Sequence, residues 1–294
     1  MLTDNMRGAL LMMASMAAFT LNDTFMKVLA GQVPLFQLMV LRGLLVTLLT
    51  GVLAARAGVL HLRLPRGDRM LIALRVVAEI GAAYFFLSAL FNMPLANVTA
   101  ILQSLPLVVT LAAALFLGEP LGWRRMVAIA IGFCGVLLIV RPGTDGFTIW
   151  SVYALISVLF VTMRDLVTRR MSGAVHSMTV TFATSLGVLV FFGIASLSVD
   201  WVPMDAAAIG LTLGAGVMVF FGYLCSVMVM RVGEIAIVAP FRYTGIIWAL
   251  LLGWFIFGDW PSGLTLIGAA IVVATGVFSF YRERQLARRH RPQG

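Results

Sequence analysis

The chain has 294 residues, of which 61% are hydrophobic and only 11% are charged. A soluble domain carries about 25% charged residues, so this composition excludes a protein that faces water on all sides. The formal net charge is +9, but the basic residues stand at the ends of apolar stretches, so we expect no nucleic-acid partner. The two cysteines, Cys134 and Cys225, lie inside apolar runs, which argues against a disulfide framework.

Ten apolar stretches are long enough to cross a membrane as helices, since about 20 residues span about 30 Å of hydrocarbon. Turn residues separate these stretches, and none shows the period-two alternation of barrel strands. The fold class that we predict is therefore all-α and integral to the membrane. The predicted helices cover residues 8–29, 34–56, 70–91, 96–117, 123–140, 148–170, 177–198, 205–231, 235–257 and 263–281.

The basic residues predict the orientation of the ten helices. With the amino terminus in the cytoplasm, 15 of the 21 lysines and arginines fall in cytoplasmic segments, and only Lys27 and Arg141 fall on the other side. This bias predicts that both termini are cytoplasmic. The cytoplasmic set is Arg7, Arg56, Arg63, Arg66, Arg69, Arg124, Arg125, Arg169, Arg170, Arg231, Arg282, Arg284, Arg288, Arg289 and Arg291.

The two halves of the sequence repeat one another weakly. A shift of 140 residues aligns Gly118 with Gly258 and Glu119 with Asp259. Each half holds five predicted helices, and because five is odd the second half enters the membrane from the opposite side. Inverted repeats of this kind are characteristic of alternating-access carriers. The other aligned pairs are Ala96 with Ala236, Ser15 with Ser157, Asp23 with Asp165, and Lys27 with Arg169.

This repeat defines the domain organisation that we predict. The first five-helix repeat covers residues 1–141, the second, inverted repeat covers residues 146–281, and a basic cytoplasmic tail covers residues 282–294. In such carriers the substrate site lies near the middle of the bilayer, where the repeats meet.

A Gly118-Glu119-Pro120 turn follows the fourth helix, Gly258-Asp259 follows the ninth, and the fifth and tenth helices carry glycines at 132, 135, 268 and 276. In these motifs and in its five-plus-five helices the chain resembles the drug/metabolite transporter superfamily, in its EamA branch. The resemblance implies a ten-helix carrier in the bacterial inner membrane, and the nearest branch exports aromatic and other neutral amino acids. Some members of the superfamily instead take up nucleoside-type metabolites such as S-adenosylmethionine. The resemblance assigns no role to individual residues.

Three carboxylates lie within predicted spans, where a charge costs about 2.5–3.5 kcal/mol. Asp23, Glu79 and Asp165 each have a basic residue four positions away on the same helix, and such pairs neutralise each other locally. The alternative is a role in proton coupling or gating, for which Glu79 is the best candidate because it lies deepest. The basic neighbours are Lys27, Arg75 and Arg169.

Arginines within spans also need partners. Arg42 has no acidic residue three or four positions away, so we expect it to meet a tertiary carboxylate or an aqueous cavity, where it suits a substrate carboxylate. Arg164 adjoins Asp165 and joins the candidates for coupling or gating, whereas Arg242 lies near the inner end of its helix and can reach the interface.

Polar and aromatic residues inside spans complete the candidate substrate contacts, with helix packing as the alternative reading. Pro106 and Pro240 interrupt the fourth and ninth helices, as hinges or as passive kinks. Small residues at four-residue spacing permit close helix contact and a homo-oligomer. The candidate substrate contacts are Asn22, Arg42, Tyr84, Gln103, Tyr153, Tyr243 and Trp248.

The motifs that are missing exclude other functions. Lys27 is the only lysine and lies in no glycine-rich loop, so the chain has no phosphate-binding loop of an ATP-driven pump. No histidine lies deep in a span and no metal-ligand spacing occurs, so we expect no catalytic residue, metal or cofactor. We predict a secondary transporter that exports aromatic and other neutral amino acids, or related small metabolites, across the lipid bilayer. The alternatives are an uptake carrier for a nucleoside-type metabolite such as S-adenosylmethionine, and a channel or non-transporting scaffold.

Overall fold

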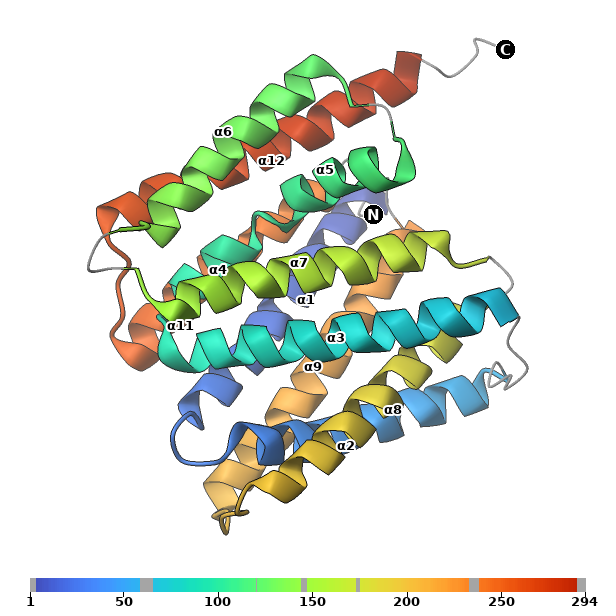
Figure 1. Cartoon of the computed structure of the whole chain (residues 1–294), viewed down its shortest axis with the longest axis vertical. Helices are drawn as coiled ribbons and strands as arrows, with labels where there is room; N and C mark the ends of the chain where they lie inside the picture. The colour runs from blue at the N-terminus through green and yellow to red at the C-terminus, as the bar shows by residue number, and fades with distance from the viewer. Residues whose placement is uncertain are drawn as a thin grey trace. The chain divides into compact units, whose positions relative to one another are not determined.

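The computed structural model describes residues 4–58, 66–119, 121–143, 147–172, 175–232 and 238–289. In these ranges the chain is helical and contains no strand, which confirms the predicted all-α class (Figure 1). The helices are α1 (Asp4–Val28), α2 (Leu35–Arg56), α3 (Arg66–Asn92), α4 (Leu95–Leu102), α5 (Leu105–Leu117), α6 (Trp123–Val140), α7 (Ile149–Arg170), α8 (Ser177–Ala195), η1 (Ser196–Ser198), α9 (Ala206–Val232), η2 (Ala239–Tyr243), α11 (Thr244–Phe257) and α12 (Gly263–Arg289).

Ten helical stretches in the described ranges are long and apolar enough to cross a membrane, and they match the ten predicted spans to within a few residues. The fourth span consists of α4 and α5, and the ninth consists of η2 and α11. The predicted start of the ninth span, residues 235–237, lies outside the described residues. Large apolar side chains such as Leu115, Phe116 and Phe255 are exposed, as surfaces that contact lipid require.

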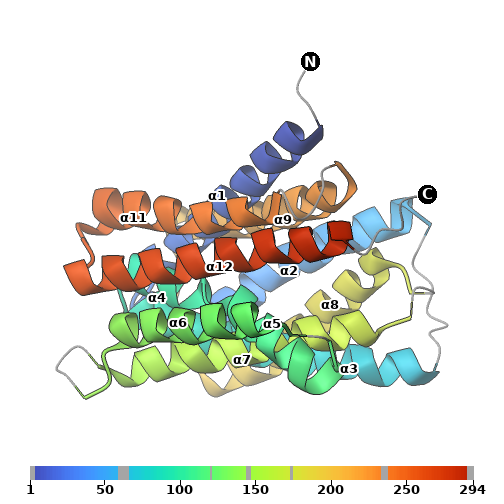
Figure 2. The same ribbon diagram turned by 90° about the horizontal axis from the view of Figure 1, so that it is seen from above.

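The contacts divide the chain into two compact units, and each unit contains helices from both halves of the sequence. The first unit comprises Met1–Thr20, Met93–Val152 and Phe221–Gly294, and the second comprises Leu21–Asn92 and Tyr153–Phe220. In the first unit α6 lies beside α12, and in the second α2 lies beside α8 (Figures 1 and 2). The packing units therefore differ from the two sequence repeats.

Glycines allow helices of the first unit to approach closely. A Cβ atom on Gly268 of α12 would lie 2.5 Å from the carbonyl oxygen of Gly135 on α6, and a Cβ atom on Gly135 would lie 2.8 Å from that of Gly268. Because the obstacle in each case is backbone, a larger residue requires the two helices to separate. Small residues at such contacts are typical of membrane helices, whose association depends on close packing.

In the second unit, polar contacts fix one end of α3 beside the end of α7. The carboxylate of Asp68 accepts hydrogen bonds from the amide nitrogen of Ser172 (3.0 Å) and from its hydroxyl (2.6 Å). Ser172 follows the last residue of α7 by two positions, whereas Asp68 lies in the first turn of α3. The two helices consequently run antiparallel.

The helices α5 and α11 end in the same kind of turn. Gly118 and Gly258 adopt left-handed backbone angles, with φ of +69° and +68°, which a residue with a Cβ atom disfavours. After each glycine, the next amide returns to the helix: Glu119 donates to the carbonyl of Ala113 (3.4 Å) and Asp259 donates to that of Gly253 (3.1 Å). The 140-residue shift that aligns Gly118 with Gly258 therefore also aligns the hydrogen bonds of the two helix caps.

Candidate functional site

A row of side chains joins α3 to α7 in the second unit. Phe85 stacks on Phe160, with ring centroids 5.7 Å apart, and lies edge-to-face on Tyr153 at 5.0 Å. The ring centroids of Tyr84 and Tyr153, two of the predicted substrate contacts, are 6.5 Å apart. We call this row the α3–α7 seam, and it consists of Glu79, Tyr84, Phe85, Tyr153, Phe160 and Arg164.

An ion network lies at one end of the α3–α7 seam. Arg164 Nη1 is 3.3 Å from Glu79 Oε2, and Arg164 Nη2 and Nε are each 2.9 Å from Asp165 Oδ1. Arg164 therefore contacts its neighbour in the sequence, Asp165, and its pairing with Glu79 on another helix was not predicted. Arg75, four residues before Glu79, donates to the hydroxyls of Thr184 and Thr168. One guanidinium thus holds two of the three carboxylates proposed for coupling.

A second polar network involves α1 and α2 of the same unit. Arg42 Nη1 donates to Asn22 Oδ1 (3.0 Å), and Asn22 Nδ2 donates to Asp23 Oδ1 (2.9 Å). Asn22 is only 3% exposed, and it connects the arginine to the carboxylate. Arg42 also donates to the sulfur of Met39 (3.3 Å). Arg42, which we expected to meet a tertiary carboxylate or an aqueous cavity, thus contacts an amide on α1 that is itself bonded to the Asp23 carboxylate.

The first unit contains the two helix breaks. Between α4 and α5 the amides of Ser104 and Leu107 make short-range bonds to residues three positions earlier, which is the pattern of a 3₁₀ turn, and η2 before α11 is also a 3₁₀ helix. Pro106 lies in the first turn of α5, after the first break, and Pro240 lies in the first turn of η2, within the second; in both places the missing proline N–H is not needed. Since α5 begins at Leu105 and α11 at residue 244, the breaks occupy corresponding places in the two halves, although the prolines do not.

Polar groups of the two breaks meet. Gln103, the last residue before the first break, donates from Nε2 to the carbonyl oxygen of Arg242 in η2 at 3.4 Å. Tyr243 is 4% exposed, and its hydroxyl lies against Gly276 of α12, where no side chain occupies the space. Within the described part of the chain this buried hydroxyl has no hydrogen-bond partner. Trp248, by contrast, is exposed on α11.

The structure thus divides the predicted site residues between its two units. In the second unit, five of them cluster at the α3–α7 seam: Glu79, Tyr84, Tyr153, Arg164 and Asp165. Three more of that unit form the network between α1 and α2: Asn22, Asp23 and Arg42. The residues at 103, 106, 240, 243 and 248 belong to the first unit.

The sequence did not identify the phenylalanines that complete the aromatic cluster. Phe36 lies 6.2 Å from Tyr84 and 5.8 Å from Phe192, measured between ring centroids, and Phe85 and Phe160 lie in the seam itself. The chain has 20 phenylalanines, and most contact lipid or other helices, so residue type alone carries no signal. These four phenylalanines differ from the others only in the helix face on which they lie, and which neighbour a helix face contacts depends on tertiary packing.

No group of three or more histidine, cysteine, aspartate or glutamate side chains that could hold a metal occurs among the described residues. Cys134 and Cys225 are free, and only Cys225 is buried. The geometry combines a guanidinium held by two carboxylates with aromatic rings on the same two helices, and both helices have membrane length.

Ten apolar helices with charges paired at membrane depth define a multi-pass membrane protein. The sequence profile of the EamA-like transporter family matches the chain twice, over residues 6–141 and 148–281. The chain therefore belongs to the EamA-like transporter family, and it has the two-repeat fold of the drug/metabolite transporters in a bacterial membrane. This family assignment confirms the resemblance that the sequence motifs indicated.

The chain is similar to several bacterial transporters. It is 29% identical over 217 residues to the riboflavin transporter of Vibrio cholerae, covering 73% of this chain and 72% of the relative. It is 27% identical over 268 residues to the pseudopaline exporter CntI of Pseudomonas aeruginosa, covering 90% and 93%. It is 24% identical over 203 residues to the S-adenosylmethionine uptake transporter of Rickettsia felis, covering 68% of each chain.

A solved crystal structure has the same fold. It superposes with a TM-score of 0.65 at 18% identity and covers 95% of this chain and 98% of the other. At this identity the likeness concerns the fold alone. The family and the relatives named above are transporters of small molecules, not enzymes.

Proposed function

We propose that the protein is a secondary transporter that exports amino acids, chiefly aromatic and other neutral ones, or related small metabolites, by alternating access between the repeats of residues 1–141 and 146–281. Both termini lie in the cytoplasm in this proposal. The observation that carries the substrate class is the α3–α7 seam, which has a guanidinium at one end and aromatic rings along the same two helices. Export is supported by the pseudopaline exporter, because that similarity extends over 90% of the chain.

The arrangement at Arg164 suits exchange of carboxylates. Asp165 binds two nitrogens of the guanidinium at 2.9 Å, whereas Glu79 binds one nitrogen at 3.3 Å. The carboxylate of an amino acid can replace Glu79 while Asp165 keeps the guanidinium in place, since arginine presents five N–H donors. An unpaired carboxylate at this depth is costly, so Glu79 is the residue at which we propose that substrate binding is coupled to protons.

The aromatic cluster accounts for the neutral side chain of the substrate. Tyr84 and Tyr153 lie on the same two helices as Glu79 and Arg164, and Phe36 contacts Tyr84 from α2. Aromatic rings bury apolar groups at a small cost in side-chain entropy, and their preferred geometries with other rings favour aromatic substrates.

Counterflow in proteoliposomes tests the proposal. Vesicles are loaded with unlabelled neutral and aromatic amino acids, and the entry of labelled ones is followed at several pH values. We expect saturable uptake that the internal load stimulates, and we expect Glu79→Gln to flatten its pH dependence. Glu119→Gln, the same change just after α5, is the matched control and should keep the wild-type pH profile. Absence of flux above empty liposomes, with folded protein, contradicts amino-acid transport.

A second candidate is an uptake carrier for a nucleoside-type metabolite. The S-adenosylmethionine uptake transporter of Rickettsia felis and its counterpart in Rickettsia conorii each match 68% of this chain at 24% identity. The same vesicles, supplied with labelled S-adenosylmethionine, distinguish the two candidates. Flux that an internal load does not stimulate would instead indicate a channel.

A further inference from the structure

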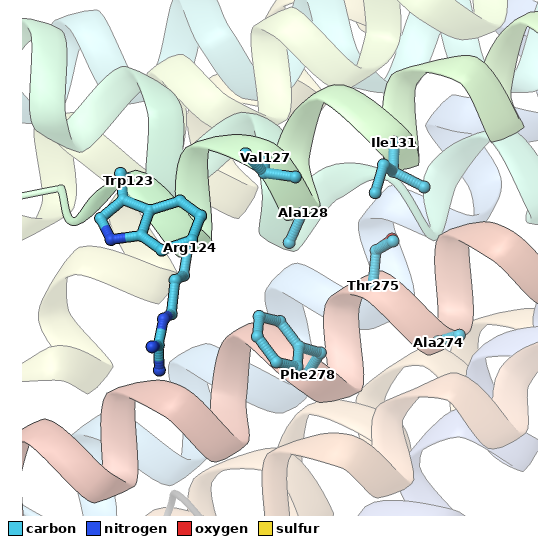
Figure 3. A pocket seen from close by; sticks show the side chains of 8 residues that line it. All are labelled: Trp123, Arg124, Val127, Ala128, Ile131, Ala274, Thr275 and Phe278. Carbon is cyan, nitrogen blue, oxygen red and sulfur yellow. The ribbon is translucent and has the colours of Figure 1, made fainter.

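A groove of about 390 Å³ lies between α6 and α12 in the first unit (Figure 3). Its walls are almost entirely apolar, with a floor that includes Ala128 and Thr275. We call it the α6–α12 groove, and its principal side chains are Trp123, Arg124, Val127 and Ile131 on α6, and Ala274 and Phe278 on α12.

The side chains of this groove are exposed. Trp123 is 72% exposed, Ile131 49% and Phe278 43%. Both helices have the length and composition of membrane spans, so apolar groups exposed along them contact lipid and not water. The α6–α12 groove is therefore open to the acyl chains of the bilayer.

One end of the groove has the chemistry of the membrane interface. Trp123 and Arg124 are the first residues of α6, and the guanidinium carbon of Arg124 lies 5.4 Å from the centre of the Trp123 ring. Tryptophan and arginine at a span end are typical of the headgroup level. Arg124 is the only charged residue among those that line the groove, and Figure 3 shows its side chain extending from α6 toward α12 near Phe278.

We propose that the α6–α12 groove binds an anionic phospholipid, with an acyl chain along the apolar walls and the phosphate at Arg124. From Trp123 to Ile131 the helix extends about 12 Å, which accommodates part of one extended chain. The volume of about 390 Å³ is near the lower end of small-ligand sites, and it is smaller than the volume of a helix segment about 12 Å long and about 10–12 Å across. The size therefore favours a lipid chain over a second copy of the protein.

The arginine, not the apolar wall, provides the selectivity. Lipid tails are as apolar as leucine, so a chain gains little by moving from the bilayer into the groove. A basic residue near the membrane surface contributes about five-fold in affinity for anionic lipid. We consequently expect a preference for the negatively charged headgroup and little discrimination between tails.

Native mass spectrometry of the full chain in detergent measures this preference. Dioleoylphosphatidylglycerol and dioleoylphosphatidylcholine, which share their tails, are titrated separately, and their apparent affinities are compared. For the wild type we expect phosphatidylglycerol to bind about five-fold more tightly. Arg124→Gln should reduce the ratio to about one, whereas Arg56→Gln, at an exposed span end that does not line the groove, should keep it.

Filling the groove tests the position of the chain. Ala274→Trp places a ring in the α6–α12 groove at an exposed position and should lower the binding of both lipids, whereas Ala130→Trp, exposed on α6 outside the groove, should not. The comparison of the two lipids on the wild-type protein requires no variant, so it tests the proposal even where a variant fails to fold. Equal affinities for the two lipids, or equal effects of the two arginine variants, overturn the proposal.

Two further outcomes would assign the groove to another occupant and likewise overturn the proposal. Displacement of phosphatidylglycerol by glycerol 3-phosphate at similar concentration would indicate a site for a soluble phosphate. A change in oligomer mass with Ala274→Trp, without a change in lipid binding, would indicate that this face is an interface between copies.

Discussion

The contact between Gly135 and Gly268 predicts that Gly268→Ala destabilises the protein. A Cβ atom on Gly268 would lie 2.5 Å from the carbonyl oxygen of Gly135 and 2.8 Å from Cγ1 of Ile139. A carbon atom approaches a carbonyl oxygen to about 3.3 Å, so about 0.8 Å is missing. The obstacle is helix backbone, which no rotamer change removes, and α6 and α12 must separate.

The magnitude follows from that separation. A gap of about 0.5–1 Å forfeits a quarter to a half of the dispersion energy of each contact, and overpacking of this kind costs about 1–3 kcal/mol. Alanine in place of glycine also stabilises a helix by up to about 1 kcal/mol. Gly193→Ala isolates this second effect, because a Cβ atom on Gly193 of α8 meets nothing within 4 Å. The free energies of unfolding of Gly268→Ala and Gly193→Ala should therefore differ by about 1–3 kcal/mol. Gly268→Ala should be less stable than the wild type, and Gly193→Ala should be more stable.

Thermal unfolding in detergent, followed by tryptophan fluorescence at one fixed heating rate, measures the difference. Membrane proteins often unfold irreversibly, so the apparent Tm is compared only between variants treated identically. We expect Gly268→Ala to unfold about 2–10 °C below Gly193→Ala. Equal Tm values for the two variants would refute the close approach of α6 and α12.

Three further predictions concern the helix breaks, the ion network and the topology. Gly276→Ala should lower the apparent Tm because its methyl group collides with the hydroxyl of Tyr243 and with its Cζ atom; since phenylalanine keeps Cζ, Tyr243→Phe should restore only part of the loss in the double variant. Arg164→Gln removes the cation that contacts both carboxylates and should cost about 1–3 kcal/mol, more than Glu79→Gln; an equal loss in apparent Tm for the two variants would contradict the ion network. A fluorescent protein fused after the last residue should fluoresce in intact cells, whereas a dark, correctly inserted fusion would place the carboxyl terminus outside the cytoplasm.

The spans were predictable from sequence because each is set by a local quantity. A stretch of apolar residues long enough to cross the bilayer must form helix to satisfy its backbone, and the glycines and prolines between stretches mark the ends. Even the left-handed caps at Gly118 and Gly258 were visible as aligned residues before their angles were known. The exact place of a helix break was less accessible, because Pro106 follows the break instead of lying at it.

The partners of charged residues could not be predicted in the same way. Spacing of four residues pointed from Glu79 to Arg75 on its own helix, but the structure brings Arg164 of α7 to within 3.3 Å of Glu79. Which helices become neighbours depends on tertiary packing, and α3 and α7 are separated by dozens of residues in the chain. Arg42 found its polar partner on α1 for the same reason.

The paired caps after α5 and α11 have a consequence for any chain that inserts its two halves in opposite directions. Five membrane crossings separate Gly118 from Gly258, so the two turns lie at opposite surfaces of the membrane. One surface meets the cell interior and the other the environment, with different pH, ions and lipid charge. A turn that is closed by backbone hydrogen bonds and a glycine does not depend on pH, ions or lipid charge, so the same kind of turn can form at both surfaces.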